Sequence, residues 1–223
     1  MPFARVTALV VLSATFLLAA PATRAAGPAP VVEKATGTAF PVTRTSPGAA
    51  AELELTGTGV RTKLIFKVYA FAFYVDPAAA RQALARWSGK SAADLRNDPA
   101  FYAALGDLAG DRLVIMHFVR DVDSAKMKEA MDEAMDRGTP KTDPARAQFL
   151  GLWTGEIKDG EDVGLLFGAD GKVTLLRAGK AVGSATSPAM ARSILQSWLG
   201  PKPVSDDIRN GLAERFPEIL KAR

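Results

Sequence analysis

The sequence predicts one domain of the α+β class. Segments rich in β-branched and aromatic residues, typical of strands, lie at 62–75, 112–122 and 149–186. Helical patterns occur in groups between and after these segments, and do not alternate with them one by one. Grouped strands and helices favour an α+β architecture over an alternating parallel fold.

The first segment is typical of a secretory signal peptide. One basic residue, Arg5, precedes an apolar run over 6–20, and small residues follow it. This run is shorter than the roughly 20 residues that a membrane-spanning helix needs. We therefore expect a signal peptide at 1–25, cleaved after Ala25 or Ala26, and an exported protein, periplasmic or secreted, with no transmembrane segment in its mature form. An uncleaved N-terminal anchor is the alternative.

The chain after the signal peptide begins with a stretch rich in Gly, Pro and Ala, which we expect to be a disordered leader over 26–37. The domain then occupies 38–223. Alternating residues predict short strands over 40–55, and a flexible Gly-containing turn follows at 56–59. The segment 62–75, TKLIFKVYAFAFYV, is the most strand-like of the chain.

The rest of the domain divides into helices and strands with recognisable boundaries. Ser91, with Asp94 three residues later, indicates a capping box, and Ser124 is the expected N-cap of another helix. Asp170-Gly171 is a strong hairpin signal. We expect helices at 77–87, 91–105, 124–137, 188–199 and 205–221, a strand at 112–122, and a β-meander over 149–186 whose strands are FLGLWTGEI, DVGLLFG and KVTLLRA.

Composition excludes several kinds of site. The chain has no cysteine, so thiolate metal sites, cysteine nucleophiles and disulfides are absent. The single histidine, His117, cannot build a multi-histidine metal site, and within a strand it is more typical of a hydrogen-bonded core residue. Without Arg5 and Arg24 the charged residues number 26 cations and 24 acids. Basic and acidic residues are interleaved, so we expect no nucleic-acid partner. No motif for a cofactor or a metal is present.

The long strand suggests a binding site. Because strand side chains alternate, Tyr69 shares a face with Lys63 and Lys67, and Arg61 joins it if the chain is already extended there. An arginine facing an apolar interior requires an anion to offset its desolvation. We therefore hypothesise an apolar pocket with an anion clamp. Alternatively, Arg61 lies at a solvated strand end or pairs with a nearby acid. We expect Lys63 and Lys67 to reach solvent. The opposite face (Leu64, Phe66, Val68, Ala70 and Ala72) is expected to pack against helices.

The run LTGTGVRTKLIFKVYAFAFYV at 55–75 resembles the signature of the chalcone isomerase family, a Gly-rich turn and an arginine before a Lys-x-x-Ala-x-x-x-Tyr strand. The resemblance continues through WSGKS at 87–91, Arg-Asp-Val at 120–122 and VSDDI at 204–208, and extends over roughly 38 to 220. It implies an open-faced β-sandwich, with a large antiparallel sheet, a helical layer on one face and a ligand cleft between them.

The same resemblance implies that the isomerase site is incomplete. The family's catalytic arginine falls on Arg61, but its threonine falls on Tyr69, and its tyrosine and asparagine fall near Met127 and Ala134. The late threonine or serine position matches Ser197. Methionine and alanine cannot provide the lost hydrogen bonds, so flavonoid cyclisation is not expected. An Arg/Tyr pair is similar to that of the fatty-acid-binding branch, where it holds a carboxylate.

Three functions follow as hypotheses. The first is a non-catalytic protein that binds a fatty acid, or another amphipathic or aromatic acid, through Arg61, Tyr69 and Ser197. Met127 and Met131 would line the apolar part of the cleft, although ordinary helix core explains them equally well. The second is an isomerase or intramolecular lyase in which Arg61 stabilises an oxyanion. The third is a scaffold with a collapsed cleft.

Overall fold

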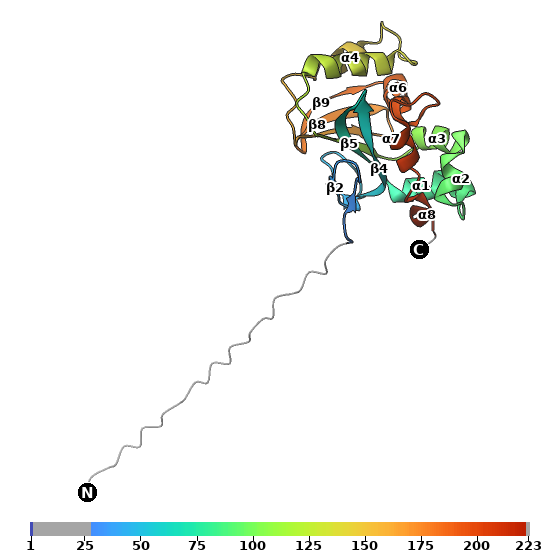
Figure 1. The fold of residues 1–223 in the computed structure, drawn as a ribbon. Helices are drawn as coiled ribbons and strands as arrows, with labels where there is room; N and C mark the ends of the chain where they lie inside the picture. The colour runs from blue at the N-terminus through green and yellow to red at the C-terminus, as the bar shows by residue number, and fades with distance from the viewer. Residues whose placement is uncertain (2–27, 222–223) are drawn as a thin grey trace.

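The computed structural model describes Met1 and residues 28–221, so residues 2–25 of the predicted signal peptide lie outside the described residues (Figure 1). Its main feature is a seven-stranded antiparallel sheet in which each strand pairs with the next along the chain. This sheet confirms the α+β class and the large antiparallel sheet that the sequence predicted. Within residues 28–221, no helix has the length and apolar character needed to cross a bilayer.

The seven strands of the sheet follow one another in chain order. They are β3 (Thr43–Arg44), β4 (Leu53–Lys63), β5 (Phe66–Val75), β6 (Arg112–Phe118), β7 (Asp162–Phe167), β8 (Lys172–Arg177) and β9 (Lys180–Thr186). A separate antiparallel pair, β1 (Val31–Val32) and β2 (Ala39–Phe40), precedes them.

A short hairpin joins β7 to β8, as the sequence predicted at Asp170-Gly171. The N–H of Gly168 donates a hydrogen bond to the carbonyl oxygen of Lys172 at 2.8 Å, which closes the loop. Gly171 has a φ of 80°, a left-handed conformation that favours glycine. The predicted hairpin is therefore confirmed.

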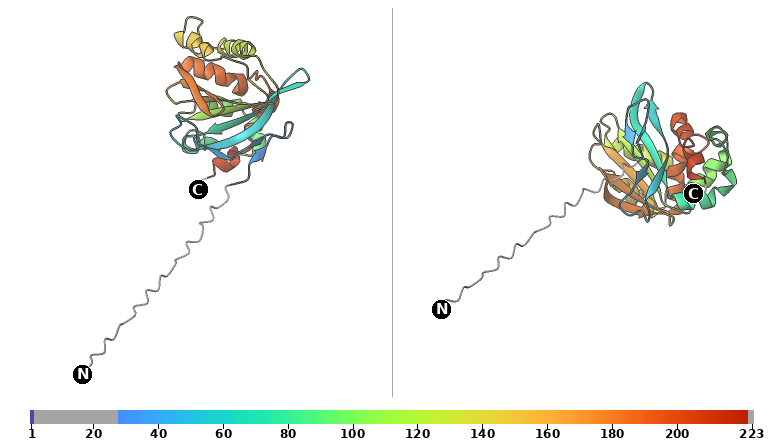
Figure 2. Two further views of the ribbon diagram at one scale, coloured as in Figure 1. Left: turned by 90° about the vertical axis from the view of Figure 1, so that its left-hand side faces the viewer. Right: turned by 90° about the horizontal axis from the view of Figure 1, so that it is seen from below.

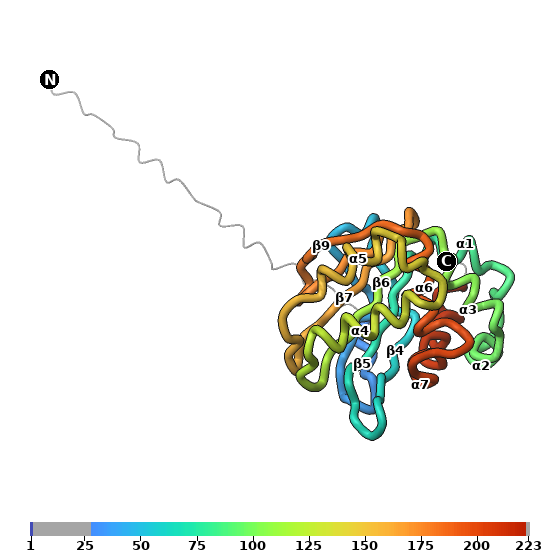
Figure 3. The backbone as a smooth tube through the Cα atoms, turned by 90° about the horizontal axis from the view of Figure 1, so that it is seen from above, coloured from blue at the N-terminus to red at the C-terminus, as the bar shows by residue number. Residues whose placement is uncertain are grey.

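The helices lie mainly over one face and at one side of the sheet. Their bounds are α1 (Pro77–Ala83), the short 3-10 turn η1 (Ala85–Trp87), α2 (Ala92–Arg96), α3 (Pro99–Gly106), α4 (Ser124–Met135), α5 (Pro144–Gly151), α6 (Pro188–Leu199), α7 (Asp206–Gly211) and α8 (Phe216–Ile219). In Figures 1 and 3, α4, α5 and α6 cover a face of the sheet, and α1, α2, α3 and α7 gather beside it.

The two faces of the sheet bury different side chains. Tyr69, Phe71 and Phe73 belong to the large core beneath the helices, where the rings of Phe71 and Trp198 lie 5.2 Å apart. Ala70 and other residues of the opposite face form a smaller core, on the side where the N-terminal strands lie (Figure 2). The prediction that the small-residue face packs against helices is therefore wrong, because the large aromatic rings fill the space beneath the helical layer.

The segment 62–75 is a hairpin and not one strand. The chain reverses at Leu64 and Ile65, so β4 ends at Lys63 and β5 begins at Phe66. The predicted flexible turn at 56–59 instead lies inside β4. Its glycines had suggested a turn, but they serve a close contact between β4 and α7.

That contact leaves no room for a side chain on β4. A Cβ atom added to Gly57 would lie 1.8 Å from the carbonyl oxygen of Gly211, and one added to Gly59 would lie 2.6 Å from the Cα of Ile208. The residues that begin α7 also reach the strand, since Ser205 Oγ donates to the carbonyl oxygen of Val60 at 2.8 Å. Backbone therefore packs directly against backbone at this point.

Several expected elements differ from the structure in extent or type. The helix predicted at 91–105 divides into α2 and α3, because Pro99 begins a new helix that Asp98 caps. The expected strand FLGLWTGEI instead begins within α5, which Asp143 caps before Pro144. In both cases an Asp-Pro pair was the overlooked signal. Asp123, and not Ser124, is the N-cap of α4.

The predicted disordered leader at 26–37 contains ordered structure in its described part. Val31 and Val32 pair with β2, and the Glu33 side chain accepts hydrogen bonds from the backbone N–H groups of Ala35 and Thr36, both at 2.8 Å. Glu33 is buried. The Glu33 carboxylate therefore closes the turn between β1 and β2, which composition alone did not indicate.

Replacing Gly57 by alanine should destabilise the domain. The added methyl group has to displace the backbone of α7, and overpacking of this kind costs about 1–3 kcal/mol or more. Urea unfolding should show a lower free energy of unfolding for Gly57→Ala. Gly151→Ala is the control, because a Cβ there meets nothing within 4 Å. Equal losses in both variants would contradict the close-contact explanation.

Candidate functional site

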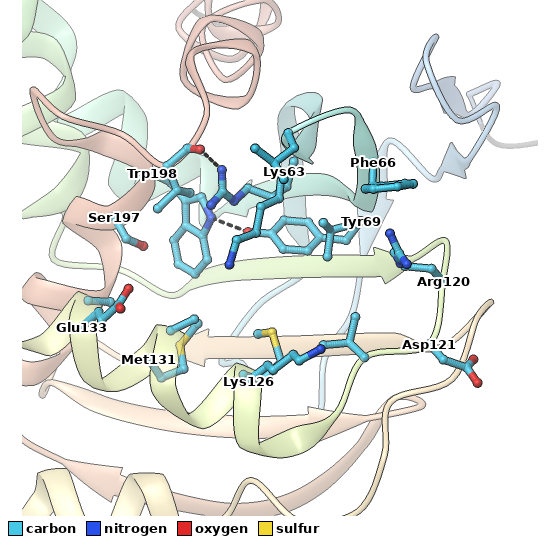
Figure 4. A pocket seen from close by; sticks show the side chains of 18 of the residues that line it. Lys63, Phe66, Tyr69, Arg120, Asp121, Lys126, Met131, Glu133, Ser197 and Trp198 are labelled. Atoms are coloured by element: carbon cyan, nitrogen blue, oxygen red, sulfur yellow. Dashed lines mark hydrogen bonds between the residues drawn. The ribbon is translucent and has the colours of Figure 1, made fainter.

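A cavity of about 440 Å³ opens between the β4–β5 hairpin, α4 and α6. Its lining is mostly apolar, and it includes each of the residues that the sequence singled out for binding. Figure 4 shows Tyr69, Trp198 and Ser197 at one end and Met131 on the helix opposite them. The lining residues that the sequence predicted are Arg61, Tyr69, Met127, Met131 and Ser197.

Arg61 and Tyr69 are direct partners across β4 and β5. Paired residues of antiparallel strands present their side chains on the same face, with Cβ atoms about 4.5–5.5 Å apart. The sequence predicted both side chains on a single strand, but they belong to two neighbouring strands. The hairpin brings them together as effectively as one strand would have done.

The Arg61 guanidinium has only carbonyl partners among the described residues. Its Nη1 donates to the carbonyl oxygens of Val204 and of Thr62, and no carboxylate of residues 28–221 forms an ion pair with it. Arg61 therefore does not pair with a nearby acid of the described residues, which was one of the alternatives. Arginine carries five N–H donors, so further donors remain for an anion in the cavity.

Tyr69 is 6% exposed, and its hydroxyl oxygen accepts a hydrogen bond of 3.3 Å from Nε1 of Trp198. Burial raises the pKa of the Tyr69 phenol above its ordinary value of 10.0, although the Trp198 hydrogen bond and the charge of Arg61 act in the opposite direction. The phenol is therefore neutral at physiological pH. Its proton is donated to no acceptor within residues 28–221, so it can be donated to a ligand.

The remaining predicted residues form the apolar side of the cavity. Met127 and Met131 are buried on α4 and belong to the main core as well as to the lining. Ser197 also lines the cavity, but its hydroxyl donates to the carbonyl oxygen of Ile194 at 2.6 Å. Ser197 can therefore accept a hydrogen bond from a ligand, whereas its own proton is already used.

The cavity has an excess of positive charge, of which the sequence placed only Arg61 in the site. Trp198 was also missed, although it directly follows Ser197 on the buried side of α6. The ionisable lining residues are the five cations Arg61, Lys63, Arg120, Lys126 and Arg137, and the two acids Asp121 and Glu133. They come from three parts of the chain, 61–63, 120–121 and 126–137, so no single spacing in the sequence marked all of them as one group.

Lys67 and His117 lie outside this site. The Lys67 ammonium donates to the carbonyl oxygen of Ala35, and Lys63 is exposed at the cavity mouth. The Nδ1 atom of His117 lies 2.8 Å from a carboxylate oxygen of Asp162. His117 is thus a hydrogen-bonded strand residue, as its position suggested.

The buried phenol predicts a loss of stability in alkali. The unfolded chain releases the Tyr69 proton near pH 10.0, whereas the folded chain retains it, so the free energy of unfolding falls as pH rises above that value. Tyr69→Phe should reduce this fall by at most about 1.4 kcal/mol per pH unit. Urea unfolding of both proteins between about pH 9 and 11, a window set by the phenol's ordinary pKa, measures how the free energy of unfolding changes with pH. The same dependence on pH in both proteins would contradict a raised pKa for Tyr69.

Comparisons with known proteins agree with this architecture. A crystal structure of a fatty-acid-binding protein from Arabidopsis thaliana has a TM-score of 0.71 at 20% identity, covering 86% of this chain and 98% of that one. At this identity the likeness shows a shared fold. Another protein of that plant, fatty-acid-binding protein 2, is 27% identical over an alignment of 209 residues, and the match covers 85% of this chain and 52% of that protein. The chain thus spans about half the length of this relative.

The family assignment comes from the C-terminal half of the chain. The model of the chalcone isomerase-like family matches residues 99–213, which is more than half of the 223 residues. This region contains α4 and α6, the two helices that complete the cavity, and it agrees with the resemblance found in the β4–β5 segment. The chain belongs to the chalcone isomerase-like family.

Proposed function

We propose that the protein binds a fatty acid, with its carboxylate between Arg61 and Tyr69 and its tail in the apolar part of the cavity. The observation that carries this proposal is the pair of unused donors. Arg61 has no acidic partner within residues 28–221, and the buried Tyr69 hydroxyl has a proton that it donates to no acceptor there. Both groups border one apolar cavity.

A carboxylate matches these donors in charge and geometry. The guanidinium pairs with carboxylates through parallel N–H groups, and a neutral phenol donates to the remaining lone pairs. Trp198 supports the arrangement, because its N–H occupies one acceptor site of the Tyr69 oxygen and leaves the phenol proton for the ligand. Hydrogen bonds to charged groups contribute about 1.5–3 kcal/mol each.

The apolar part of the cavity is suited to an acyl chain. Met127 and Met131 present unbranched thioether side chains, which adjust to irregular apolar shapes. The volume of about 440 Å³ lies within the range of sites that enclose small molecules. The excess of cations at the opening also favours an acid over a neutral lipid.

The relatives support the same ligand class. The similar protein of A. thaliana is described as a fatty-acid-binding protein, and so is the solved structure with the same fold. An enzymatic cyclisation has less support, because the apolar side chains of Met127 and Ala134 line the cavity, and Ser197 uses its proton within its own helix. We therefore favour binding without catalysis.

We also propose that the protein is exported, on the basis of the signal-like segment at 1–25. Intact mass measurement of the protein from the envelope fraction should give a chain that begins after Ala25 or Ala26. An intact N-terminus on protein that stays in the cytoplasm would contradict this.

Arg61→Ala should weaken binding of palmitate by about 10- to 100-fold, since the charged hydrogen bonds to the carboxylate are lost. Methyl palmitate distinguishes this effect from general damage to the cavity. Its ester carries no charge, so it should bind wild type more weakly than palmitate does, and Arg61→Ala should bind it as wild type does. Displacement of a fluorescent fatty acid measures the four affinities.

Arg137→Ala is the matched control. Arg137 also lines the cavity, but its guanidinium donates to the carbonyl oxygen of Lys202 at 3.0 Å, and Tyr69 has Arg61 as its strand partner. It should lower palmitate affinity much less than Arg61→Ala. Equal losses in the two variants would show that only the total charge of the cavity matters, and would overturn the clamp.

A further inference from the structure

The turn between β4 and β5 exposes three consecutive large apolar side chains. Leu64 is 90% exposed, Ile65 is 84% exposed and Phe66 is 53% exposed. In Figures 2 and 3 this hairpin projects beyond the other elements of the domain. Contiguous exposed apolar side chains are uncommon on soluble domains and mark interaction sites.

The conformation of the turn adds to this observation. Leu64 has a φ of 58°, in the left-handed region. Glycine is the usual residue at the first position of a two-residue hairpin turn with this conformation, because a Cβ atom is strained there. The turn thus holds a leucine where glycine would fold more easily, and the leucine packs into no core cluster of the described chain.

The surroundings of the turn are cationic. Lys63 and Lys67 flank the three apolar residues, and Arg120 lies over the ring of Phe66, 4.8 Å from its centroid. Lys126 lies across the cavity mouth from them (Figure 4). These four cations are exposed, and none forms an ion pair within residues 28–221. Asp121, the acid beside Arg120, already pairs with Lys158 at 3.1 Å, and the other acid of the lining, Glu133, lies near Ser197 (Figure 4).

We propose that the β4–β5 turn docks the protein on an anionic lipid bilayer. Apolar side chains between cations match the interface, where side chains enter the acyl boundary while basic groups meet the anionic headgroups. Leu64 and Phe66 also line the cavity. The docked orientation therefore directs the opening towards the acyl chains, so that, if the proposed function holds, the ligand enters and leaves through the membrane surface.

Vesicle sedimentation tests the docking without any fatty acid. The wild-type protein should bind vesicles of phosphatidylcholine mixed with phosphatidylglycerol, and bind vesicles of phosphatidylcholine alone more weakly. Added salt should weaken binding to the mixed vesicles. Ile65→Asp should lower affinity for them at least about tenfold, because it places a negative charge at the tip. Val182→Asp, at an exposed apolar position on β9, is the matched control and should bind as wild type does.

A second variant distinguishes loss of vesicle binding from loss of folding. Leu64→Gly should unfold at the same or a higher urea concentration than wild type, yet bind mixed vesicles less. Ile65 does not line the cavity, so Ile65→Asp should keep wild-type affinity for palmitate in solution. Absence of palmitate binding by the wild type would overturn the proposed function alone, since vesicle binding is measured separately.

Three results would overturn the docking proposal. The first is absence of wild-type binding to mixed vesicles, and the second is equal binding by Ile65→Asp. The third is self-association of wild type, but not of Ile65→Asp, in gel filtration without any vesicle binding. That result would assign the apolar tip to an interface between two copies of this chain.

Discussion

The close backbone contact between β4 and α7 determines the position of the proposed ligand clamp. Gly57 and Gly59 let the helix approach until its backbone touches the strand. Two side chains of the α7 region then bind the backbone of Val60, since Asp207 accepts from its N–H and Ser205 donates to its carbonyl oxygen, both at 2.8 Å. The next residue is Arg61, whose guanidinium donates to the carbonyl oxygen of Val204, just before α7.

This contact connects the fold to the chemistry of the cavity. The strand register then places Tyr69 beside Arg61, and α6 brings Trp198 to the phenol oxygen. The phenol is neutral at physiological pH even with its ordinary pKa, and burial raises that pKa further, so an uncharged donor lies next to a permanent cation. Such a pair stabilises an anion, whereas the methionines of α4 provide apolar contact for the rest of the ligand.

The sequence predicted the parts of this structure that depend on local patterns. The α6 bounds, the Ser91 capping box and the Asp170-Gly171 hairpin all follow from local residue preferences, and the structure confirms them. The hairpin at Leu64 was not predictable, because neither Leu64 nor Ile65 is a typical turn residue. The glycines at 56–59 wrongly indicated a turn. Their role is a tertiary contact with a helix near the end of the chain, which no local pattern reveals.

The candidate site also combines residues that local patterns predict with residues that only the tertiary fold brings together. The sequence predicted that Arg61 and Tyr69 lie on one face, but the reason was partly wrong. Period-two alternation correctly placed Tyr69 on the face of the cavity. Arg61 lies next to it because the two residues pair across neighbouring strands. Trp198 and the cations at the mouth come from elements distant in sequence. Only the fold brings them together, and no spacing rule could have found them.

A crystal structure of the protein with bound palmitate tests the proposed clamp. The carboxylate should lie within hydrogen-bond distance of the Arg61 guanidinium and the Tyr69 hydroxyl, with the tail against Met127 and Met131. A carboxylate held at the mouth by Lys126 or Arg120, with its tail directed towards Tyr69, would contradict it.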